Sequence, residues 1–558
     1  MTIDPVTFAV VRGSLEQIAD EMDLHLIRAA LSPILSETND CAHGFYDPAT
    51  GEMVAQGGYG LPLFLANMQF TVQAVLAAAA EQGGFHDGDI WITNDPYLSG
   101  THLQDTVLVA PYYRNGELVT LMASTGHLMD VGGSVPGGWV PTAREIHQEG
   151  FIIPPVRLQE AGRFNHALLR TILANSRLAQ QMQGDLAAMA NVFTVGRRGL
   201  DALLDKFGLA AVRGCIADMM VRSEAQMRAM LRDIPDGTYR FEDYFDNDGV
   251  EDRRLTVRLA ARIAGDRLTL DFAGTSPTAT GPMNISAGTA KSMCLVALRH
   301  LFPDLPVNGG TFRPVTFVIP EGCLLNARYP APVGGTTDVT HRVLDVLFGC
   351  LAQAVPERVP AAPHGTTGVV TFSGRKADGA FYVAVFPYPG GYGGSAVSDG
   401  LVNGTAPGSM AKFMSIEMSE HRYPLRFERF AIREGSGGAG RQRGGCGTEY
   451  SITALSDCVV SVLGDRVDHP PFGVAGGLPA AANQVRFVTG GREWTPELRS
   501  KAEKIALKQG DRVEVASPGG GGFGDPRDRD PAAVAQDLAD GIIDRVAAEV
   551  LYGARAKS

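Results

Sequence analysis

Two copies of the pattern His-Leu-x-Asp lie close together in the chain, as His102/Asp105 and His127/Asp130. Neutral imidazole nitrogens together with carboxylate oxygens are common ligands of zinc, manganese, iron and cobalt. If the fold brings the two copies together, they predict a site for one divalent cation. A hydrogen-bonded His–Asp pair without a metal has the same composition, so a purely structural role stays open at this point.

A β-hairpin is the element that has to position these residues. Two apolar runs with β character separate the two copies and are joined at Asn115-Gly116. Asn-Gly between such runs is the strongest short-range hairpin signal, because a type I′ turn needs positive φ at both central positions. Regular pairing outward from this turn predicts Asp105 opposite Gly126. That register puts His127 on the other face from Asp105, so we expect the ladder to break near Gly126.

Two further segments carry polar residues that fit a site. The loop at 135–155 follows the hairpin directly and is rich in glycine and proline. Such a loop is expected to line a neighbouring site. Its charged and histidine residues include Arg144, Glu145, His147 and Glu149. Asp40 and His43 lie just before a predicted turn at 47–51, and either an ordinary strand start or an active-site role fits them.

Composition narrows the class of protein. The chain has 558 residues, 45% of them hydrophobic, and a formal net charge of −12, which argues against nucleic acid as a partner. Its seven cysteines form no Cys-x-x-Cys pair, so we expect neither a disulfide framework nor a zinc ribbon. We see no signal peptide and no membrane span in the sequence. The expected location is therefore the cytoplasm.

Glycine-rich runs near the C-terminus suggest nucleotide binding, but the required residues are missing. A phosphate-binding P-loop needs Gly-Lys followed by Ser or Thr, and Gly-Lys occurs nowhere in the chain. A Gly-x-Ser-x-Gly nucleophile elbow is also missing. We therefore expect this chain to bind no ATP by itself.

The order of predicted elements indicates a mixed α/β (α+β) fold of several subdomains. Periodicity predicts helices at 5–30, 66–81, 168–184, 200–231, 284–301, 338–355 and 531–551, with strands concentrated at 237–276 and 423–520. We expect an N-terminal α/β region at 1–235 that carries the hairpin and a helical segment. After it we expect a central α/β region at 236–422. The last region, at 423–558, is expected to be β-rich and to end in a helix.

Several motifs, in the same order along nearly the whole chain, resemble the hydantoinase B/oxoprolinase family. The central one is Asn94-Asp-Pro-Tyr-x-x-Gly-Thr-His-x-x-Asp105, followed by Gly126-His-x-x-Asp-Val-Gly-Gly133. Arg422-Tyr-Pro-x-Arg426 and the glycine run from Pro518 to Pro526 add to the match. The family includes subunits of ATP-dependent hydantoinases, caprolactamase and acetone or acetophenone carboxylases, and the C-terminal half of 5-oxoprolinases.

The resemblance implies a metal site and a division of labour between two subunits. In the carboxylase members two histidines and one aspartate hold manganese, and the match falls on His102, Asp105 and His127. It implies a divalent cation, Mn or Zn, in this chain. ATP with Mg would belong to a partner, a hydantoinase A-type subunit, in a heterotetramer with two copies of each chain.

The resemblance leaves three functions open. The first is ring-opening hydrolysis of a hydantoin, lactam or oxoproline after the partner has phosphorylated it. The second is an acetone- or acetophenone-type carboxylation, and the third is a non-catalytic scaffold. Asp130 and Asp95 are our candidates for a general base or for orienting the ligands, because metal-bound imidazoles usually donate their free N–H to a carboxylate. The chain departs from a common family pattern at Pro62–Leu65, where many members carry a histidine.

Overall fold

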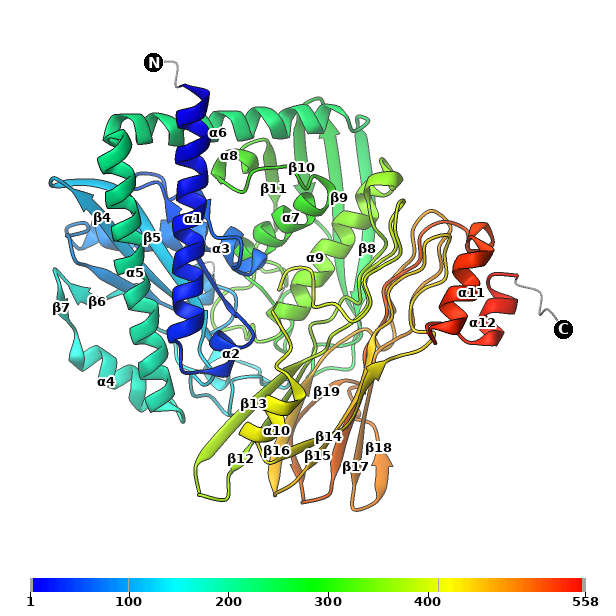
Figure 1. Cartoon of the computed structure of the whole chain (residues 1–558). Coiled ribbons are helices and arrows are strands. Elements are labelled where there is room, and N and C mark those ends of the chain that lie inside the picture. Colours follow the sequence, from blue (N-terminus) through cyan, green and yellow to red (C-terminus); the bar gives the residue numbers. More distant parts are fainter. Residues whose placement is uncertain (1–3, 99, 410, 554–558) are drawn as a thin grey trace.

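The N-terminal third of the chain forms one antiparallel sheet that carries the predicted hairpin. The computed structural model describes residues 4–98, 100–409 and 411–553. The strand order of this sheet is β2-β1-β5-β4-β3-β6-β7. Figure 1 shows its blue and cyan strands behind helices α1 (Pro5–Ala29) and α5 (Ala179–Phe207). The strands are β1 (Cys41–Tyr46), β2 (Met53–Gln56), β3 (Ile90–Thr93), β4 (Asp105–Arg114), β5 (Glu117–His127), β6 (Val156–Glu160) and β7 (Arg163–Phe164).

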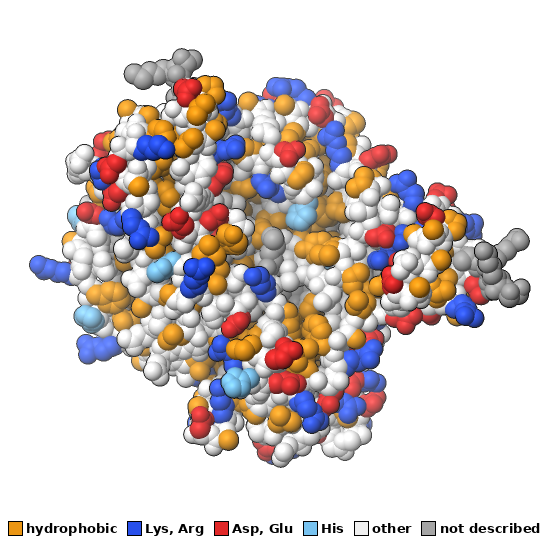
Figure 2. All heavy atoms as spheres, viewed as in Figure 1, with side chains coloured by type: hydrophobic (Ala, Val, Ile, Leu, Met, Phe, Trp, Pro, Cys, Tyr) orange, Lys and Arg blue, Asp and Glu red, His pale blue; other side chains and the backbone are white. Residues whose placement is uncertain are grey.

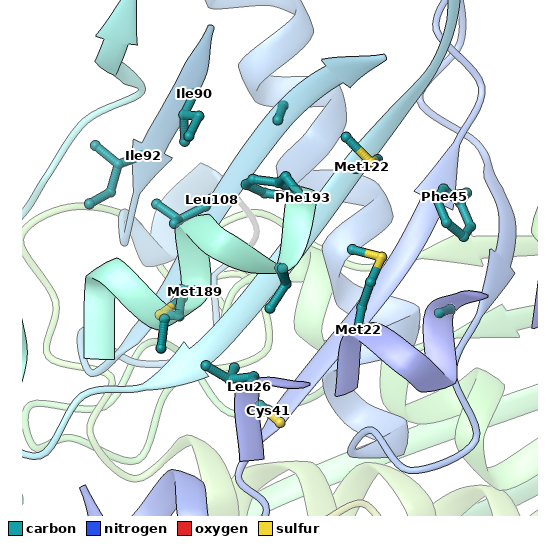
Figure 3. Close-up of a cluster of buried hydrophobic side chains, with 14 of the residues drawn as sticks. Met22, Leu26, Cys41, Phe45, Ile90, Ile92, Leu108, Met122, Met189 and Phe193 are labelled. Carbon is teal, nitrogen blue, oxygen red and sulfur yellow. The ribbon is translucent and has the colours of Figure 1, made fainter. Parts of the chain in front are cut away.

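Helices cover both faces of this sheet, so its strands are buried on both sides. Helices α1 and α5 pack on one face, and α3 (Pro62–Glu81) packs on the other. Figure 3 shows the first of these contacts. Its labelled side chains from α1 and α5 are Met22, Leu26, Met189 and Phe193, and those from the strands are Cys41, Phe45, Ile90, Ile92, Leu108 and Met122. Side chains of a strand point alternately to the two faces, which leaves the α3 face free for other residues.

The helical segments begin and end at residues other than those the sequence predicted. In place of helices at 168–184 and 200–231, the chain forms α4 (His166–Ala174), α5 and α6 (Leu209–Arg232). The break between α5 and α6 is at Gly208, whose φ of 78° suits glycine at a helix end. The terminal helix predicted at 531–551 is likewise two helices, α11 (Pro531–Ala539) and α12 (Arg545–Val550), with Gly541 between them.

A second, four-stranded sheet with the order β11-β10-β9-β8 forms the centre of the molecule. Its strands are β8 (Gly237–Phe245), β9 (Leu255–Ala264), β10 (Arg267–Asp271) and β11 (Val315–Val318). The buried helices α7 (Ala287–Leu301) and α9 (Thr336–Leu351) pack with it in one hydrophobic cluster. The short helix α2 (Pro33–Ser36) lies between α1 and β1 in the chain, and the short helix α8 (Gly309–Phe312) lies between α7 and β11. The N-terminus of α9 points toward the hairpin end, as described below.

The last region contains two sheets and the short helix α10 (Ile416–Arg422). One sheet consists of β12 (Val369–Arg375), β13 (Phe381–Pro387), β16 (Cys458–Leu463) and β19 (Lys501–Leu507). The other consists of β14 (Leu425–Ile432), β15 (Thr448–Ala454), β17 (Gln484–Thr489), β18 (Arg492–Trp494) and β20 (Arg512–Ala516). Strands β12 and β13 precede residue 423. The two sheets therefore include residues that lie before the predicted start of the C-terminal region.

Buried charges join the central region to the C-terminal sheets. Arg342 on α9 donates from Nη2 to Asp465 Oδ1 at 2.8 Å, and Arg466 donates to Asp243 Oδ2 on β8 at 2.7 Å. Lys501 donates to the other oxygen of Asp465 at 2.8 Å. Because all five side chains are buried, each charge depends on its partners for compensation.

Helix α3 is long and apolar enough to cross a bilayer, which the sequence inspection had not suggested. More than half of its most apolar stretch is buried inside the protein, where it packs on the N-terminal sheet. Core helices of globular proteins share these properties, so the feature is weak evidence for a membrane.

Candidate metal centre

The hairpin places Asp105 and His127 directly opposite each other. Asp105 is the first residue of β4 and His127 the last of β5, and the two are paired in the ladder. The predicted partner of Asp105, Gly126, pairs instead with Thr106. The cause is an extra residue close to the turn, because Tyr112 pairs with Thr120 whereas Tyr113 pairs with Leu118, which leaves Val119 without a counterpart.

This bulge decides which face of the sheet carries the site. One inserted residue moves every later side chain of that strand to the other face. The bulge at Val119 therefore turns His127 to the same face as Asp105, on the side of α3. The predicted break near Gly126 was wrong in position, although the need for a break was real.

The third residue, His102, lies in the turn that precedes β4. Its Nδ1 is 3.2 Å from Asp105 Oδ2, and His127 Nδ1 is 3.2 Å from Asp105 Oδ1. The two imidazole rings are 5.0 Å apart between centroids and nearly perpendicular. One possible ligand atom from each of the three residues lies within 4.8 Å of the other two. The structure therefore brings His102, Asp105 and His127 together as the sequence predicted.

Hydrogen bonding leaves two imidazole nitrogens of this group without a partner. His102 Nδ1 faces Asp105 but lacks hydrogen-bond geometry, and His127 Nε2 has no partner within the described chain. Thr101 donates its hydroxyl to Asp105 Oδ2 and helps to hold that carboxylate. Buried polar atoms normally find partners, so the unpaired nitrogens indicate that something else binds here. Two imidazoles and a carboxylate fit a divalent transition metal.

Burial and charge shift the ionisation of all three groups. Burial lowers the pKa of His102 to about 4, since the nearby Asp105 only partly offsets the loss of solvent. Burial also opposes the charged forms of the other two. At His127 the negative charges of Asp105 and Asp40 outweigh burial and raise the pKa. At Asp105 the two histidines and the Thr101 hydroxyl outweigh burial and lower the pKa. A metal ion needs the neutral form of an imidazole ligand, so protonation of His127 would compete with metal binding.

The three residues line a cavity of about 80 Å³, which we call the inner chamber. All three regions of the chain contribute to its walls. Trp139, from the loop at 135–155, stacks on His127 with an interplanar angle of 16° and touches His102 edge-on. Thr336 and Thr337, in the first turn of α9, also line it, so the positive end of that helix faces the chamber.

Asp40 is the further acidic residue of the chamber. Its carboxyl lies in the wall, and its backbone oxygen accepts a hydrogen bond from His127 N at 3.1 Å. Burial raises the pKa of Asp40 to about 7, in spite of the nearby His127. One of its oxygens, Oδ1, has no partner within the described chain. The sequence left its role open because Asp40 stands 65 positions before Asp105, at an ordinary strand start.

The structure does not bring Asp130 or Asp95 to the chamber. Asp130 is buried and holds the following loop, accepting hydrogen bonds from the backbone of Gly132, Gly137 and Arg177 and from the Arg177 guanidinium at 2.9 Å. Asp95 accepts a hydrogen bond from the backbone of Tyr97 at 2.9 Å. Neither carboxyl lines the inner chamber.

The loop at 135–155 contributes Trp139 to the chamber, while its charged residues have other contacts. Glu149 accepts hydrogen bonds from the backbone nitrogens of Val333 and Gly334, at 3.0 and 2.8 Å. Burial raises the pKa of Glu149 to about 8. The imidazole of His147 lies 2.9 Å from the hydroxyl of Tyr329. We therefore assign the loop's part in the chamber to its aromatic residue.

His43 belongs to a separate buried group on the opposite face of the sheet. Its Nδ1 is 2.6 Å from Asp23 Oδ1 and its Nε2 is 2.9 Å from Ser124 Oγ. Together with Cys41, Asp23 and His43 also lie within metal-binding distance of one another. These side chains are fully enclosed and none of them lines the inner chamber. We regard this group as a structural tie between α1 and the sheet.

Known proteins share both the sequence and the architecture. Residues 4–526 match the model of the family described as Hydantoinase B/oxoprolinase. Caprolactamase subunit beta of Pseudomonas jessenii is 32% identical over 570 residues, covering 99% of this chain and 96% of that protein. The crystal structure of the ATP-dependent caprolactamase from that organism has a TM-score of 0.91 at 30% identity, covering 100% and 98% of the two chains. Nucleotide-free acetone carboxylase shares the fold, with a TM-score of 0.90 at 19% identity over 99% and 79% of the two chains.

Proposed function

Because the chain belongs to the hydantoinase B/oxoprolinase family, we propose that it is the metal-containing subunit of a two-component, ATP-dependent cyclic amidohydrolase. Its substrate would be a hydantoin, lactam or oxoproline-type ring. The observation that supports this best is that His102, Asp105 and His127 form a buried cluster in one chamber. The unpaired imidazole nitrogens and the mixed nitrogen and oxygen donors fit Mn or Zn.

The chamber offers what ring opening of an activated amide requires. A divalent ion held there lowers the pKa of a bound water to about 7 and polarises a carbonyl oxygen. Asp40, with its pKa raised to about 7, can accept a proton from the attacking water near neutral pH. Trp139 and the apolar wall residues keep bulk water away from the reacting groups. Asp40 therefore replaces Asp130 and Asp95 as our candidate general base.

ATP would be bound elsewhere in the assembly. The caprolactamase relative is named as a beta subunit and its crystal structure as that of an ATP-dependent enzyme. This chain has no Gly-Lys for a P-loop. We propose a hydantoinase A-type partner that uses ATP with Mg, two copies of each chain in a heterotetramer, and a cytoplasmic location. Calorimetry should detect no ATP binding to this chain alone, and micromolar affinity (about −8 kcal/mol) would contradict the division of labour.

Metal content tests the proposal directly. Elemental analysis of the purified chain should find close to one Mn or Zn per chain, and His102→Ala should lose it. His43→Gln is the matched control and should keep the metal. His43 is also a buried histidine next to a carboxylate, that of Asp23, but the pair lies on the opposite face of the sheet. Equal metal in the wild type and His102→Ala would reject the site.

Substrate class needs the co-expressed pair of subunits. Assays with ATP against hydantoins, lactams and 5-oxoproline should give ring-opened products. Turnover only of ketones with bicarbonate would instead establish the carboxylase alternative, which shares this fold. Activity of the pair that persists after the metal site is removed would favour a scaffold role for this chain.

A further inference from the structure

A second, larger cavity lies beside the inner chamber. We call it the outer cavity; its volume is about 580 Å³. It is formed by the segment between β2 and α3, by the C-terminal half of α7 and by the loop that follows α7. Figure 2 shows this face of the molecule hollowed near its middle, with hydrophobic and histidine side chains around the hollow. A volume of this size accommodates a small organic molecule.

The two cavities are separated by a thin partition. Pro62 lines the outer cavity while its neighbours Leu61 and Leu63 line the inner chamber. In the same way Pro407 lines the outer cavity while Gly408, the next residue, lines the inner one. The two segments are joined where Leu63 N donates to Gly408 O at 3.0 Å.

This partition can open without breaking regular structure. Leu63 lies in the first turn of α3, where backbone N–H groups have no partner within the helix. Water or a ligand oxygen can therefore replace Gly408 O as the acceptor. Pro62, at the first helical position, has no N–H to lose. Movement of the segment around residue 408 away from α3 would thus connect the two cavities.

The outer cavity presents one cation to its interior. Arg299, near the end of α7, lines the cavity and is only partly exposed. One of its N–H groups donates to Leu305 O. Within the described parts of the chain no carboxylate forms an ion pair with it, and the nearest negative influence is Asp304. A guanidinium has five N–H donors, so Arg299 keeps donors for an anion.

The neighbouring histidine presents an acceptor. His300 Nδ1 lies 2.9 Å from the carbonyl oxygen of Val296, which can only accept, so Nδ1 carries the proton. His300 is exposed at the surface, and in its neutral ring Nε2 carries no proton. Its Nε2 is then an acceptor that suits a ligand N–H. Most of the remaining wall is proline and aliphatic carbon.

We propose that the outer cavity binds a small organic anion with an apolar body, an N–H group toward His300 and a phosphate or carboxylate toward Arg299. It would serve as an antechamber to the inner chamber. The binding site follows from the cavity itself. Identification of the ligand as a phosphorylated cyclic amide rests on the proposed function.

Binding of phenyl phosphate and of inorganic phosphate to the full chain tests the proposal. Phenyl phosphate should bind more tightly than inorganic phosphate because of the apolar wall. Arg299→Gln should weaken phenyl phosphate binding at least tenfold, whereas Arg492→Gln, a change at an exposed arginine on β18, should leave it unchanged. Calorimetry or phosphorus NMR provides the measurement. Equal binding by wild type and Arg299→Gln would overturn the proposal.

Removal of metal separates this result from the proposed function. Chelator-treated protein and His102→Ala should bind phenyl phosphate as the wild type does, because the ligand lies on the outer side of the partition. Loss of binding in either would show that the anion binds in the inner chamber and would reject the antechamber. If the purified wild-type chain contains no metal but still binds phenyl phosphate, only the proposed metal site would be rejected and the outer cavity would stand.

Discussion

Asp105 bridges the two histidines of the inner chamber, with one carboxylate oxygen 3.2 Å from His127 Nδ1 and the other 3.2 Å from His102 Nδ1. A single negative charge therefore serves both imidazoles, and all three side chains are buried. Asp105→Asn keeps the shape of the side chain but removes its charge and a hard oxygen donor. We expect the affinity for the metal to fall by about tenfold to a hundredfold, which competition with a chelator would measure.

The same measurement on Asp130→Asn provides the control. Asp130 lies outside the chamber and is paired with Arg177. We expect normal metal content in this variant but a loss in unfolding free energy on the order of 2–3 kcal/mol, because charged hydrogen bonds to the loop are weakened. Denaturant titration measures the loss. Metal lost from Asp130→Asn as readily as from Asp105→Asn would return Asp130 to the list of site residues.

His127→Ala should uncouple ATP consumption from product formation in the co-expressed pair. Under the proposed function, activation by the partner would not need this chamber, whereas attack by water would, since bulk water has a pKa near 15.7 and is a poor nucleophile at neutral pH. Phosphate release should continue while ring-opened product falls to near background. A normal ratio of product to ATP consumed would mean that the chemistry takes place elsewhere.

Glu149 should make stability depend on pH. Its pKa rises from an ordinary 4.5 to about 8 in the folded chain, so the folded state holds this proton more tightly than the unfolded state. Stability from this group is therefore full below about pH 4.5 and is lost as pH rises through 8, by a few kcal/mol in all. Glu149→Gln has no such proton. Its melting temperature should fall less than that of the wild type between pH 6 and pH 9, and parallel curves would contradict the assignment.

Breaking the buried charge network should be costly. Arg466→Met leaves Asp243 buried without its main partner, and we expect a loss of about 3–5 kcal/mol in unfolding free energy. Arg486→Met is a matched control in the same region, because Arg486 pairs with Glu514 and Glu493 at the surface. Exposed pairs contribute about 0–1 kcal/mol. Similar losses for both variants would show that the network is not the cause.

The sequence predicted the parts of the site that depend on local signals. Asn115-Gly116 specified a hairpin turn, and both residues have positive φ. The hairpin then predicted that both His-Leu-x-Asp copies meet at its open end, and the family resemblance singled out His102, Asp105 and His127. The bulge at Val119 was not predictable, because it depends on how β5 packs between β1 and β4 and not on its own composition. A one-residue shift of this kind reverses the faces of a strand while leaving the sequence pattern intact.

Residues brought from distant segments were the other part that sequence could not supply. Asp40 precedes the hairpin in the chain and Trp139 follows it, and Thr336 and Thr337 come from the first turn of α9. Each lies in a segment with an ordinary local role. The helix ends were missed for a similar reason. The apolar periodicity continues across Gly208, so the pattern predicts one helix where the chain forms α5 and α6. Asp130 was overvalued because it repeats the motif, although its contacts hold a loop.

The charge network that joins α9 to the C-terminal sheets also has a consequence for the order of events during synthesis. Arg342 leaves the ribosome more than a hundred residues before Asp465, its partner in the finished protein. Until then its carboxylate partners are Asp345 on the same helix, whose Oδ2 accepts from Nη1 at 3.3 Å, and Asp243 on β8, 3.9 Å from Nε. On a nascent chain that ends before residue 465, docking of α9 against β8 therefore lacks the shortest of the three ion pairs, and burial of the guanidinium is less favourable. The network that supports α9, whose first turn lines the inner chamber, is completed only after most of the polypeptide has been made.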